Sequence, residues 1–589
     1  MVSTLTWVLA GLVAYTLAAM ALKARGVVPD YIRFSGPITT IHTQRGKVLL
    51  DRLARPRRFW RAWGNLGVGV ALVVMVGSFL LFVLGAQQAI VNPQPTALNE
   101  PRNALAIPGV NDFLPLSVAP EILLGLLLGL VVHEGGHGLF CRVEDVGIES
   151  MGVALLTVLP VGAFVEPDED ELLRSDRGTQ IRMYAAGVTN NFALAIVALV
   201  LLFGPVAGSI AVVDGFPVGG TLPGTPAAEA GIGSGDVITA VDGRQVSDPA
   251  ELREVLSSTD AQRVEVTRRD AEAVTVQREV VVSSAVASAP LTGGDTIVSV
   301  NGTNVSTSDA FVRAAARHPV AELATEDGRT VTMPTGGYVL VAEDGPLDDA
   351  GAPAGEGVVV TAVDGRRTVN GTALAAVLAD TDPERTVPVV AYVDGQRQVY
   401  DVDVATNERT GGALLGVTLE PGVSGIEVND FGIDAYPAAT FLSVIGGDSG
   451  GAETPDLGFA RRIYFTFLLP VIGAAPGTGF AYNFPGFTSF WTNFYTVEGP
   501  LGALGKTPVF LLANALFWTG WINIVVGQFN CVPTFPLDGG HILRATTESV
   551  VSRLPVPDRR QVTTAVTVAV TLSMVASLFL MVFGQRLLA

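Results

Sequence analysis

Six apolar runs along the chain are each long enough to form a membrane-spanning helix. They cover residues 3–22, 64–86, 119–141, 181–213, 507–529 and 562–585. Because a helix of about 20 apolar residues crosses a bilayer, these runs predict six transmembrane helices. A further apolar stretch, 459–480, is broken by arginines and prolines, which favours a re-entrant or interfacial segment over a crossing.

Composition and the placement of basic residues agree with a multi-pass membrane protein and predict its orientation. Of the 589 residues, 49% are hydrophobic, and the mean hydropathy is +0.44, which is too apolar for an ordinary soluble chain. Lysine and arginine gather in residues 23–61, whereas residues 88–118 carry only Arg102. Basic loops stay in the cytoplasm and attract anionic lipid. We therefore expect 119–141 to run inward and the block 214–458 to lie outside the cell.

The block expected outside is rich in predicted strands and repeats itself. Gly235–Gly243 (GDVITAVDG) recurs as Gly294–Gly302 (GDTIVSVNG) and, without the aspartate, as Gly357–Gly365 (GVVVTAVDG). Each run ends in a turn dipeptide and precedes a helical segment such as Pro249–Leu256. With Ala227–Gly231 ahead of it, the first copy resembles a PDZ domain of the protease-associated kind. The edge of the sheet in a PDZ domain can accept an extended peptide as an added strand. The alternative is that the copies are spacers or steric plugs.

The charge balance is strongly acidic. Asp and Glu number 56 against 37 Lys and Arg, for a formal net charge of -19, and Lys23, Lys47 and Lys506 are the only lysines. An acidic, lysine-poor surface stays hydrated in high salt, which favours a salt-loving prokaryote, an archaeon. The alternative is a coding bias toward Arg and Ala. Nothing in the charge pattern indicates nucleic-acid binding.

The third apolar run ends in a cluster that can bind a metal, His133-Glu134-Gly135-Gly136-His137. Residues four apart share one face of a helix, so His133 and His137 can hold one zinc ion. Glu134 can then serve as general base toward a zinc-bound water. A buried polar cluster between helices is the alternative, but charged groups are costly to place in lipid.

A catalytic zinc needs a third protein ligand, and the best candidate follows the run 507–529. Asp538 lies in the segment Asn530–His541 (NCVPTFPLDGGH), where an apolar helix breaks at two prolines. The alternative reading of this segment is an ordinary helix-ending turn. The two cysteines, Cys141 and Cys531, border the same region. We prefer Asp538 because two histidines with one carboxylate leave a position for water.

The two motifs together resemble those of the site-2 proteases, the zinc intramembrane proteases, which combine H-E-x-x-H with N-x-x-P-x-x-x-L-D-G-G. Residues 160–165 (PVGAFV) look like the family's membrane-embedded β-hairpin. Ala186–Phe192 (AGVTNNF) is similar to its A-G-P-x-x-N-F segment, with valine in place of the proline. By register, the resemblance implies that Asn191, with Asn190 as its rival, positions the substrate or the developing oxyanion. It also implies that the substrate is a membrane-tethered regulator.

The patterns predict a polytopic α-helical membrane protein with an extracytoplasmic α+β block of repeats, and the resemblances imply that it has a membrane-embedded β-hairpin and that the repeats are PDZ-like. The expected parts are N-terminal helices (1–118), a first catalytic core (119–213), the repeats (214–440), a re-entrant or interfacial segment (441–506) and a second catalytic core (507–589).

The predicted activity is that of a zinc endopeptidase which cleaves transmembrane proteins within or beside the bilayer. His133, His137 and Asp538 would hold one Zn²⁺, with Glu134 as the catalytic base and Asn191 as the further catalytic residue that the resemblance implies. Two other classes stay open. A membrane zinc transporter would use the same ligands but has no need of Glu134. A non-catalytic scaffold would only display the PDZ-like repeats.

Overall fold

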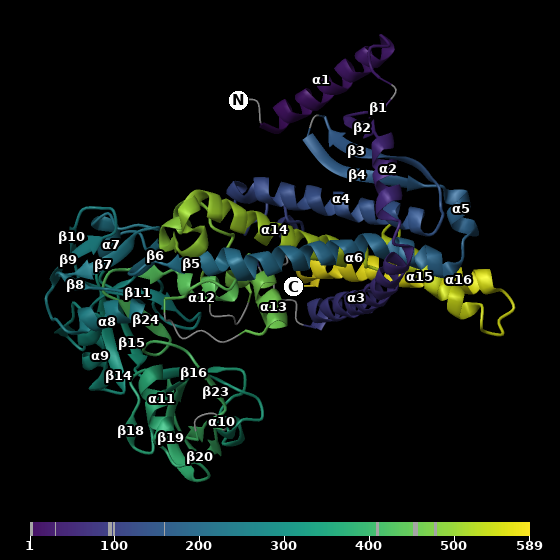
Figure 1. Ribbon diagram of the computed structural model, residues 1–589. Helices are drawn as coiled ribbons and strands as arrows, with labels where there is room; N and C mark the ends of the chain where they lie inside the picture. Colours follow the sequence, from purple (N-terminus) through teal and green to yellow (C-terminus); the bar gives the residue numbers. More distant parts are fainter. Residues whose placement is uncertain are drawn as a thin grey trace. The chain divides into compact units, whose positions relative to one another are not determined.

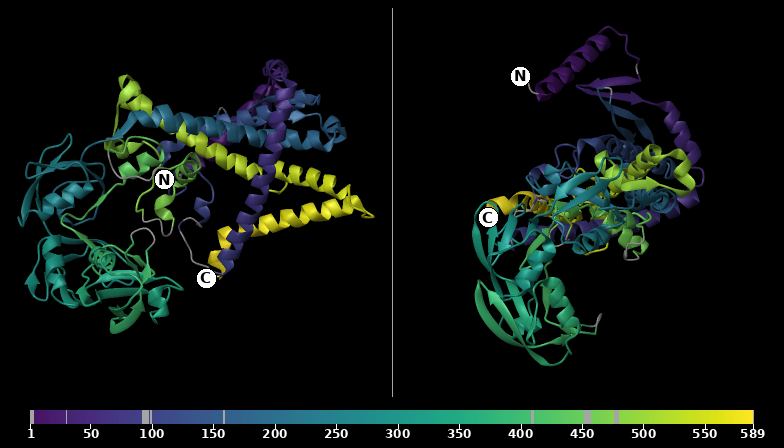
Figure 2. Two further views of the ribbon diagram at one scale, coloured as in Figure 1. Left: turned by 60° about the horizontal axis from the view of Figure 1, so that its bottom comes forward. Right: turned by 90° about the vertical axis from the view of Figure 1, so that its left-hand side faces the viewer.

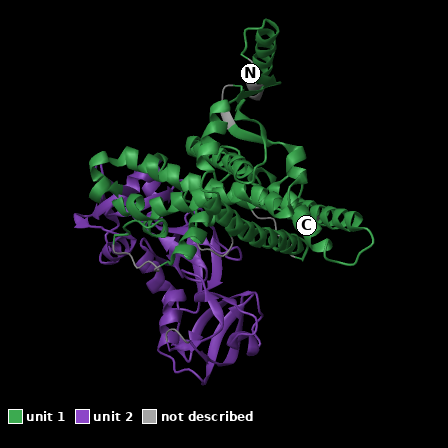
Figure 3. Cartoon of the chain, turned by 45° about the vertical axis from the view of Figure 1, so that its right-hand side comes forward, with its two compact units in different colours: residues 1–211, 439–489, 496–589 green, residues 212–438, 490–495 purple. Residues whose placement is uncertain are grey.

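The computed structural model describes residues 4–29, 31–91, 97, 100–157, 159–407, 411–450, 457–475 and 480–588. The chain forms two compact units, coloured separately in Figure 3. Unit 1 comprises Met1–Ala211, Ala439–Ser489 and Thr496–Ala589, and unit 2 comprises Val212–Ala438 and Phe490–Tyr495. Unit 2 is thus inserted into unit 1, whose segments from both ends of the sequence fold together.

Long apolar helices form the frame of unit 1. They include α3 (Arg57–Val91), α4 (Ala119–Val143), α6 (Arg177–Leu201), α14 (Lys506–Asn530) and α16 (Arg559–Phe579) (Figure 1). In the described part of the chain, five helical segments are long and apolar enough to cross a bilayer, and each contains one of these helices. Residues 4–22 of the first predicted run lie in α1 (Thr4–Ala24). Its apolar stretch among the described side chains, Ala10–Ala24, is shorter, so a crossing there stays a prediction.

Small residues let the helices of unit 1 approach closely. The helices α4, α6 and α14 pack against one another, and α3 packs on α6. A Cβ atom added at Gly125 of α4 would lie 3.0 Å from Thr519 Cα of α14, and one at Gly527 would lie 2.9 Å from the Phe192 ring of α6. The hydrophobic effect contributes little to helix association in lipid, so close van der Waals packing has to stabilise the bundle instead. The helix α16 runs back from α15 and meets α3 toward the C-terminal end of the chain (Figure 2).

A four-stranded antiparallel sheet with the order β1-β2-β3-β4 completes the part of unit 1 around α4. The hairpin expected at residues 160–165 is formed by β3 (Ile148–Leu156) and β4 (Leu159–Pro167), although the side chains of residues 159–161 lie outside the described part. The strands β1 (Ile32–Ser35) and β2 (Ile38–His42) come from the stretch expected to be a basic loop. Strands of four and five residues are too short to show a period of their own. They are ordered by pairing, because β2 pairs with β3 and β1 pairs with β2.

Shorter elements link these parts of unit 1. They are α2 (Gln44–Leu53), α5 (Glu169–Arg174), α12 (Ala438–Val444), α13 (Phe459–Leu468), α15 (Asp538–Val551) and α17 (Gln585–Leu588). The helix α13 has 10 residues, about half of what a crossing needs. The re-entrant or interfacial character expected of residues 459–480 stays a prediction, and residues 476–479 lie outside the described part.

Unit 2 contains three six-stranded sheets that share one strand order. The first is β6 (Phe216–Thr221), β7 (Val237–Val241), β8 (Arg244–Gln245), β9 (Arg263–Arg268), β10 (Val274–Gln277) and β25 (Ile433–Ala435). The second is β11 (Val280–Ala285), β12 (Thr296–Val300), β13 (Thr303–Asn304), β14 (Val320–Thr325), β15 (Thr330–Pro334) and β24 (Ile426–Asn429). The third is β16 (Gly337–Val341), β17 (Gly357–Val363), β18 (Arg366–Arg367), β19 (Thr386–Val393), β20 (Gln396–Asp403) and β23 (Val417–Leu419). Their helices are α8 (Pro249–Ser257), α9 (Ser308–Ala316) and α11 (Gly371–Ala379).

The three sheets are nested rather than strung in line. The sheets are completed in the reverse of the order in which they begin. The strand β23 joins the third sheet, β24 then joins the second, and β25 joins the first. The third sheet is therefore inserted in the second, and the second in the first. The strand order supports three related folding units. Their likeness to PDZ domains stays a prediction.

The repeated turn dipeptides have a conformational cause. Asp242-Gly243 and Asn301-Gly302 both have positive φ at each residue, +47° and +77° in the first pair and +48° and +74° in the second. Two-residue hairpin turns of this kind match the twist of the strands and favour Asp-Gly and Asn-Gly. Asp364-Gly365 repeats the geometry in the third sheet, so this copy folds alike without the aspartate that starts the other two runs.

Candidate active site

The histidine pair predicted from the sequence lies near the end of α4. One helical turn separates His133 and His137, and their Nε2 atoms are 3.2 Å apart. Their rings meet edge to face with centroids 4.8 Å apart. His133 is buried and His137 half-buried. Both rings thus turn a nitrogen toward one point inside the helix bundle.

Asp538 meets this pair from a distant part of the chain. It is the first residue of α15, which follows the break after α14. Its Oδ2 atom lies 3.1 Å from His133 Nε2 and 3.4 Å from His137 Nε2. Gly539 and Gly540 allow this approach, because a Cβ atom at either would collide with the backbone of residues 531–535. The Asp-Gly-Gly run is therefore more than a turn signal.

The three side chains fit a zinc ion. Their ligand atoms lie within 4.8 Å of one another, the only such group of three or more His, Cys, Asp or Glu residues found in the described part of the chain. Tetrahedral ligands at about 2.1 Å from zinc are about 3.4 Å apart, close to the distances seen here. The buried Oδ2 atom of Asp538 has no hydrogen-bond partner among the described residues. A cation would satisfy that oxygen.

The outer nitrogens of both rings have partners that favour metal binding through Nε2. The Nδ1–H group of His137 donates to the Met183 carbonyl of α6 at 2.9 Å. The Nδ1 atom of His133 lies 3.3 Å from Asn191 Nδ2, while the buried Oδ1 atom of Asn191 has no partner. A half-turn of this amide satisfies both groups, since Oδ1 then accepts from Nδ1–H of His133. Such contacts set the tautomer and aim of a metal-binding ring.

Glu134 and the rival Asn190 have different surroundings. The Oε2 atom of half-buried Glu134 accepts a hydrogen bond from the backbone N–H of Val165 in β4 at 3.0 Å. Asn190 instead faces α3, where its Oδ1 accepts from Trp63 Nε1 at 3.1 Å. Of the two asparagines, Asn191 is thus the one that contacts a candidate ligand.

Gly187 is a part of the site that the sequence reasoning missed. It sits on α6 opposite α4, and a Cβ atom there would lie 2.7 Å from His137 Nε2 and 2.8 Å from His133 Cε1. The rings thus occupy the space that any side chain would need. The Ala186-Gly187 pair was a signal of close helix packing, but it did not reveal what packs there.

The remaining polar groups near the site have other partners. Cys141 and Cys531 are buried, and neither joins the cluster of candidate ligands formed by His133, His137 and Asp538. His541 stacks on Tyr184 with ring centroids 4.5 Å apart. Burial lowers the pKa of its imidazole. This ring supports the start of α15 against α6 and lies outside the three-residue cluster.

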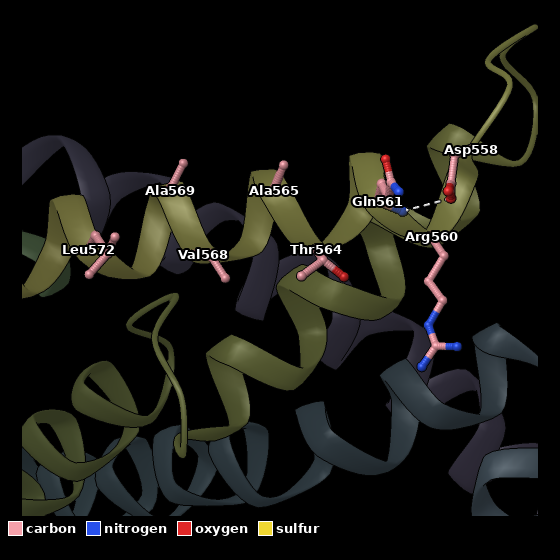
Figure 4. Close-up of a pocket in the computed structure, with 8 residues that line it drawn as sticks. All are labelled: Asp558, Arg560, Gln561, Thr564, Ala565, Val568, Ala569 and Leu572. Atoms are coloured by element: carbon pink, nitrogen blue, oxygen red, sulfur yellow. Dashed lines mark hydrogen bonds between the residues drawn. The ribbon is translucent and has the colours of Figure 1, made fainter.

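Two surface hollows in unit 1 lack the cluster residues. One, of about 720 Å³, is lined by eight residues of α16 and its cap, among them Asp558, Arg560 and Leu572 (Figure 4). The other, of about 420 Å³, lies among α3, α4 and α6 and includes Trp63 and Asn190. Neither brings a second set of metal ligands together.

Comparison with known proteins points the same way as the geometry. A family model described as Peptidase family M50 matches residues 121–575. A "Membrane-bound transcription factor site-2 protease homolog" of Arabidopsis thaliana is 28% identical over 34% of this chain and 38% of its own length. "Uncharacterized protein MJ0971" of Methanocaldococcus jannaschii is 28% identical over 29% of this chain and 44% of its own length.

A shorter match concerns a different kind of protein. "Putative serine protease HhoA" of Synechocystis sp. is 57% identical over 44 residues, which are 8% of this chain and 11% of that protein. The chain spans less than half the length of each of these three relatives.

Proposed function

Because the chain belongs to peptidase family M50, we propose that it is a zinc endopeptidase that hydrolyses peptide bonds within or beside the membrane. The observation that carries the proposal is the convergence of His133, His137 and Asp538 from α4 and α15, with Glu134 next to the first ligand. Two neutral imidazoles and one carboxylate form a ligand set that leaves a position for water.

The roles of the side chains follow from their chemistry. A zinc ion in this cluster would polarise the scissile carbonyl and lower the pKa of a water molecule. Glu134 would take the proton of that water at its carboxylate and deliver it to the leaving amine. Asn191 would hold the His133 ring through Nδ1. The oxyanion role that the resemblance implies for Asn191 stays a prediction.

We infer that the substrate binds as an extended strand. A helix uses its carbonyl groups in internal hydrogen bonds, so a transmembrane helix has to unwind before cleavage. The strand β4 ends the sheet order β1-β2-β3-β4 and contacts Glu134 through Val165. An unwound segment that pairs with β4 would therefore lie beside the general base.

The proposal extends to the class of substrate and to the side of the membrane on which each unit lies. We infer that the substrate is a membrane-tethered regulator already shortened by another protease, with unit 2 outside the cell and the metal ligands toward the cytoplasm. Unit 2 would then exclude substrates with bulky outer domains. The acidic composition supports a role in a high-salt cell.

Zinc transport and scaffolding are the competing functions, and Glu134 separates them from hydrolysis. The test is the zinc content of the purified protein together with cleavage of a model transmembrane peptide. We expect Glu134→Gln to keep the zinc and the fold and to lose cleavage, because only the proton acceptor changes. A Glu134→Gln variant that cleaves at the wild-type rate would refute the assignment as a hydrolase.

A further inference from the structure

The edge of the four-stranded sheet that no strand covers packs against α4, and it shares one hydrogen bond with the candidate general base, Glu134. Among the described residues, no strand pairs with the side of β4 that faces away from β3. On that side, the Val165 N–H group donates to Glu134 Oε2 at 3.0 Å. The Val165 N–H group, which could donate to an added strand, therefore already donates to the carboxylate of Glu134.

The pairing pattern shows why the backbone N–H group of Val165 points away from β3. In an antiparallel sheet, the backbone groups of successive residues alternate between the two sides of the strand. Val165 lies opposite Met151, and the Met151 carbonyl accepts a hydrogen bond from Thr43 N–H, on the β2 side, at 2.9 Å. Met151 therefore turns its polar groups away from β4, and Val165 turns its own toward the open edge. Ala163, opposite Val153 in the same unbroken register, also faces that edge.

We propose that the Val165 N–H group is a latch on Glu134 that an extended substrate opens. A strand that pairs with β4 needs the N–H groups of Ala163 and Val165 as donors. Its carbonyl oxygen then replaces the carboxylate of Glu134 at Val165. The freed carboxylate can turn to the water at the metal ligands. Docking of unwound backbone and release of the general base thus become one event, whereas a helical segment, which offers no free carbonyl, leaves the latch closed.

The inference rests on the proposed function, but binding to zinc-free protein tests it apart from cleavage. The probe is a fluorescent, uncharged peptide of about eight residues rich in Val and Thr, the length of an ordinary strand. Without metal there is no turnover, so fluorescence anisotropy reports affinity alone. Wild-type zinc content and cleavage of a transmembrane peptide, measured separately, decide the proposed function.

The variants separate the latch from a general change at the site. Glu134→Ala removes the competitor for Val165 N–H, so we expect it to bind the peptide about tenfold more tightly than wild type, the effect of about one charge-assisted hydrogen bond. Glu134→Gln keeps an uncharged acceptor and should give a smaller gain. Val165→Ala keeps the N–H group and should match wild type within about twofold.

Proline substitutions supply the controls, because an outward N–H group on an edge strand is not part of the ladder. Val165→Pro removes the latch itself, so adding Glu134→Ala to it should produce no further gain. Ala163→Pro removes an anchor without touching the latch and should weaken binding. The proposal is overturned if Glu134→Ala binds no more tightly than wild type, or if its gain persists beside Val165→Pro. The first comparison leaves the backbone unchanged, so the proposal can be judged even if a proline variant fails to fold.

Discussion

Replacing Gly187 by alanine should damage the metal site from a helix that supplies no ligand. The new Cβ atom would lie 2.7 Å from His137 Nε2 and 2.8 Å from His133 Cε1. Ordinary contacts at such positions are about 3.4 Å or more, so the rings or the helix must shift by about 0.7 Å. Metal sites tolerate ligand displacements of only about 0.2 Å. Loss of a hydrogen bond that orients a metal ligand lowers metal affinity by ~10–100-fold. We expect Gly187→Ala to lower zinc affinity by at least as much.

The rings cannot evade the methyl group easily, because each is held at its outer nitrogen. His137 is tied to the Met183 carbonyl and His133 to Asn191, both on the same helix as Gly187. Helix propensity acts in the opposite direction, since alanine in place of glycine stabilises a helix by about 1 kcal/mol. A loss of zinc affinity would therefore reflect the site and not a weaker helix.

Gly135 provides the matched control for this experiment. It lies between the two ligands in sequence, yet a Cβ atom there would meet nothing within 4 Å. Zinc affinity measured by competition with a coloured chelator, with thermal unfolding as a check on the fold, should be nearly unchanged in Gly135→Ala and greatly reduced in Gly187→Ala. If the second variant held zinc as tightly as wild type, the packing of α6 on the imidazoles would not govern the site.

Three further outcomes follow from the structure. Asp538→Asn should lower zinc affinity by more than about 100-fold, because a ligand is worth more than a supporting contact; unchanged zinc content and cleavage would mean that another third ligand is used. Deleting residues 216–440 should leave zinc bound and admit substrates with folded outer domains. If the truncated protein still rejects them, unit 2 is no filter, and if zinc is lost, the block is structural. In unit 2, Arg278→Met should cost about 3–5 kcal/mol in chemical unfolding, because it leaves buried Asp430 without its paired cation. Adding Asp430→Leu should recover much of that loss, and strictly additive costs would argue against a coupled pair.

The apolar runs and the two short motifs predicted the long apolar helices and the three residues that converge as candidate ligands. Long helices in lipid must be apolar along a fixed length, and five of the six runs are helical segments long enough to cross. The spacing of His133 and His137 determines that they share a helix face, because that relation is local. The Asp-Gly and Asn-Gly dipeptides likewise predicted turns, since their φ values are a local property.

Relations between distant segments came only from the folded chain. Nothing local shows that β1 and β2 extend the hairpin, or that the last strands of the three sheets return in reverse order, because strand partners are chosen by pairing and burial across the whole unit. The same holds for the space opposite Gly187, which the two imidazoles fill, and for the hydrogen bond between Glu134 and Val165. Each depends on how two elements pack, and a single sequence records only the residues that permit the contact, not the contact itself.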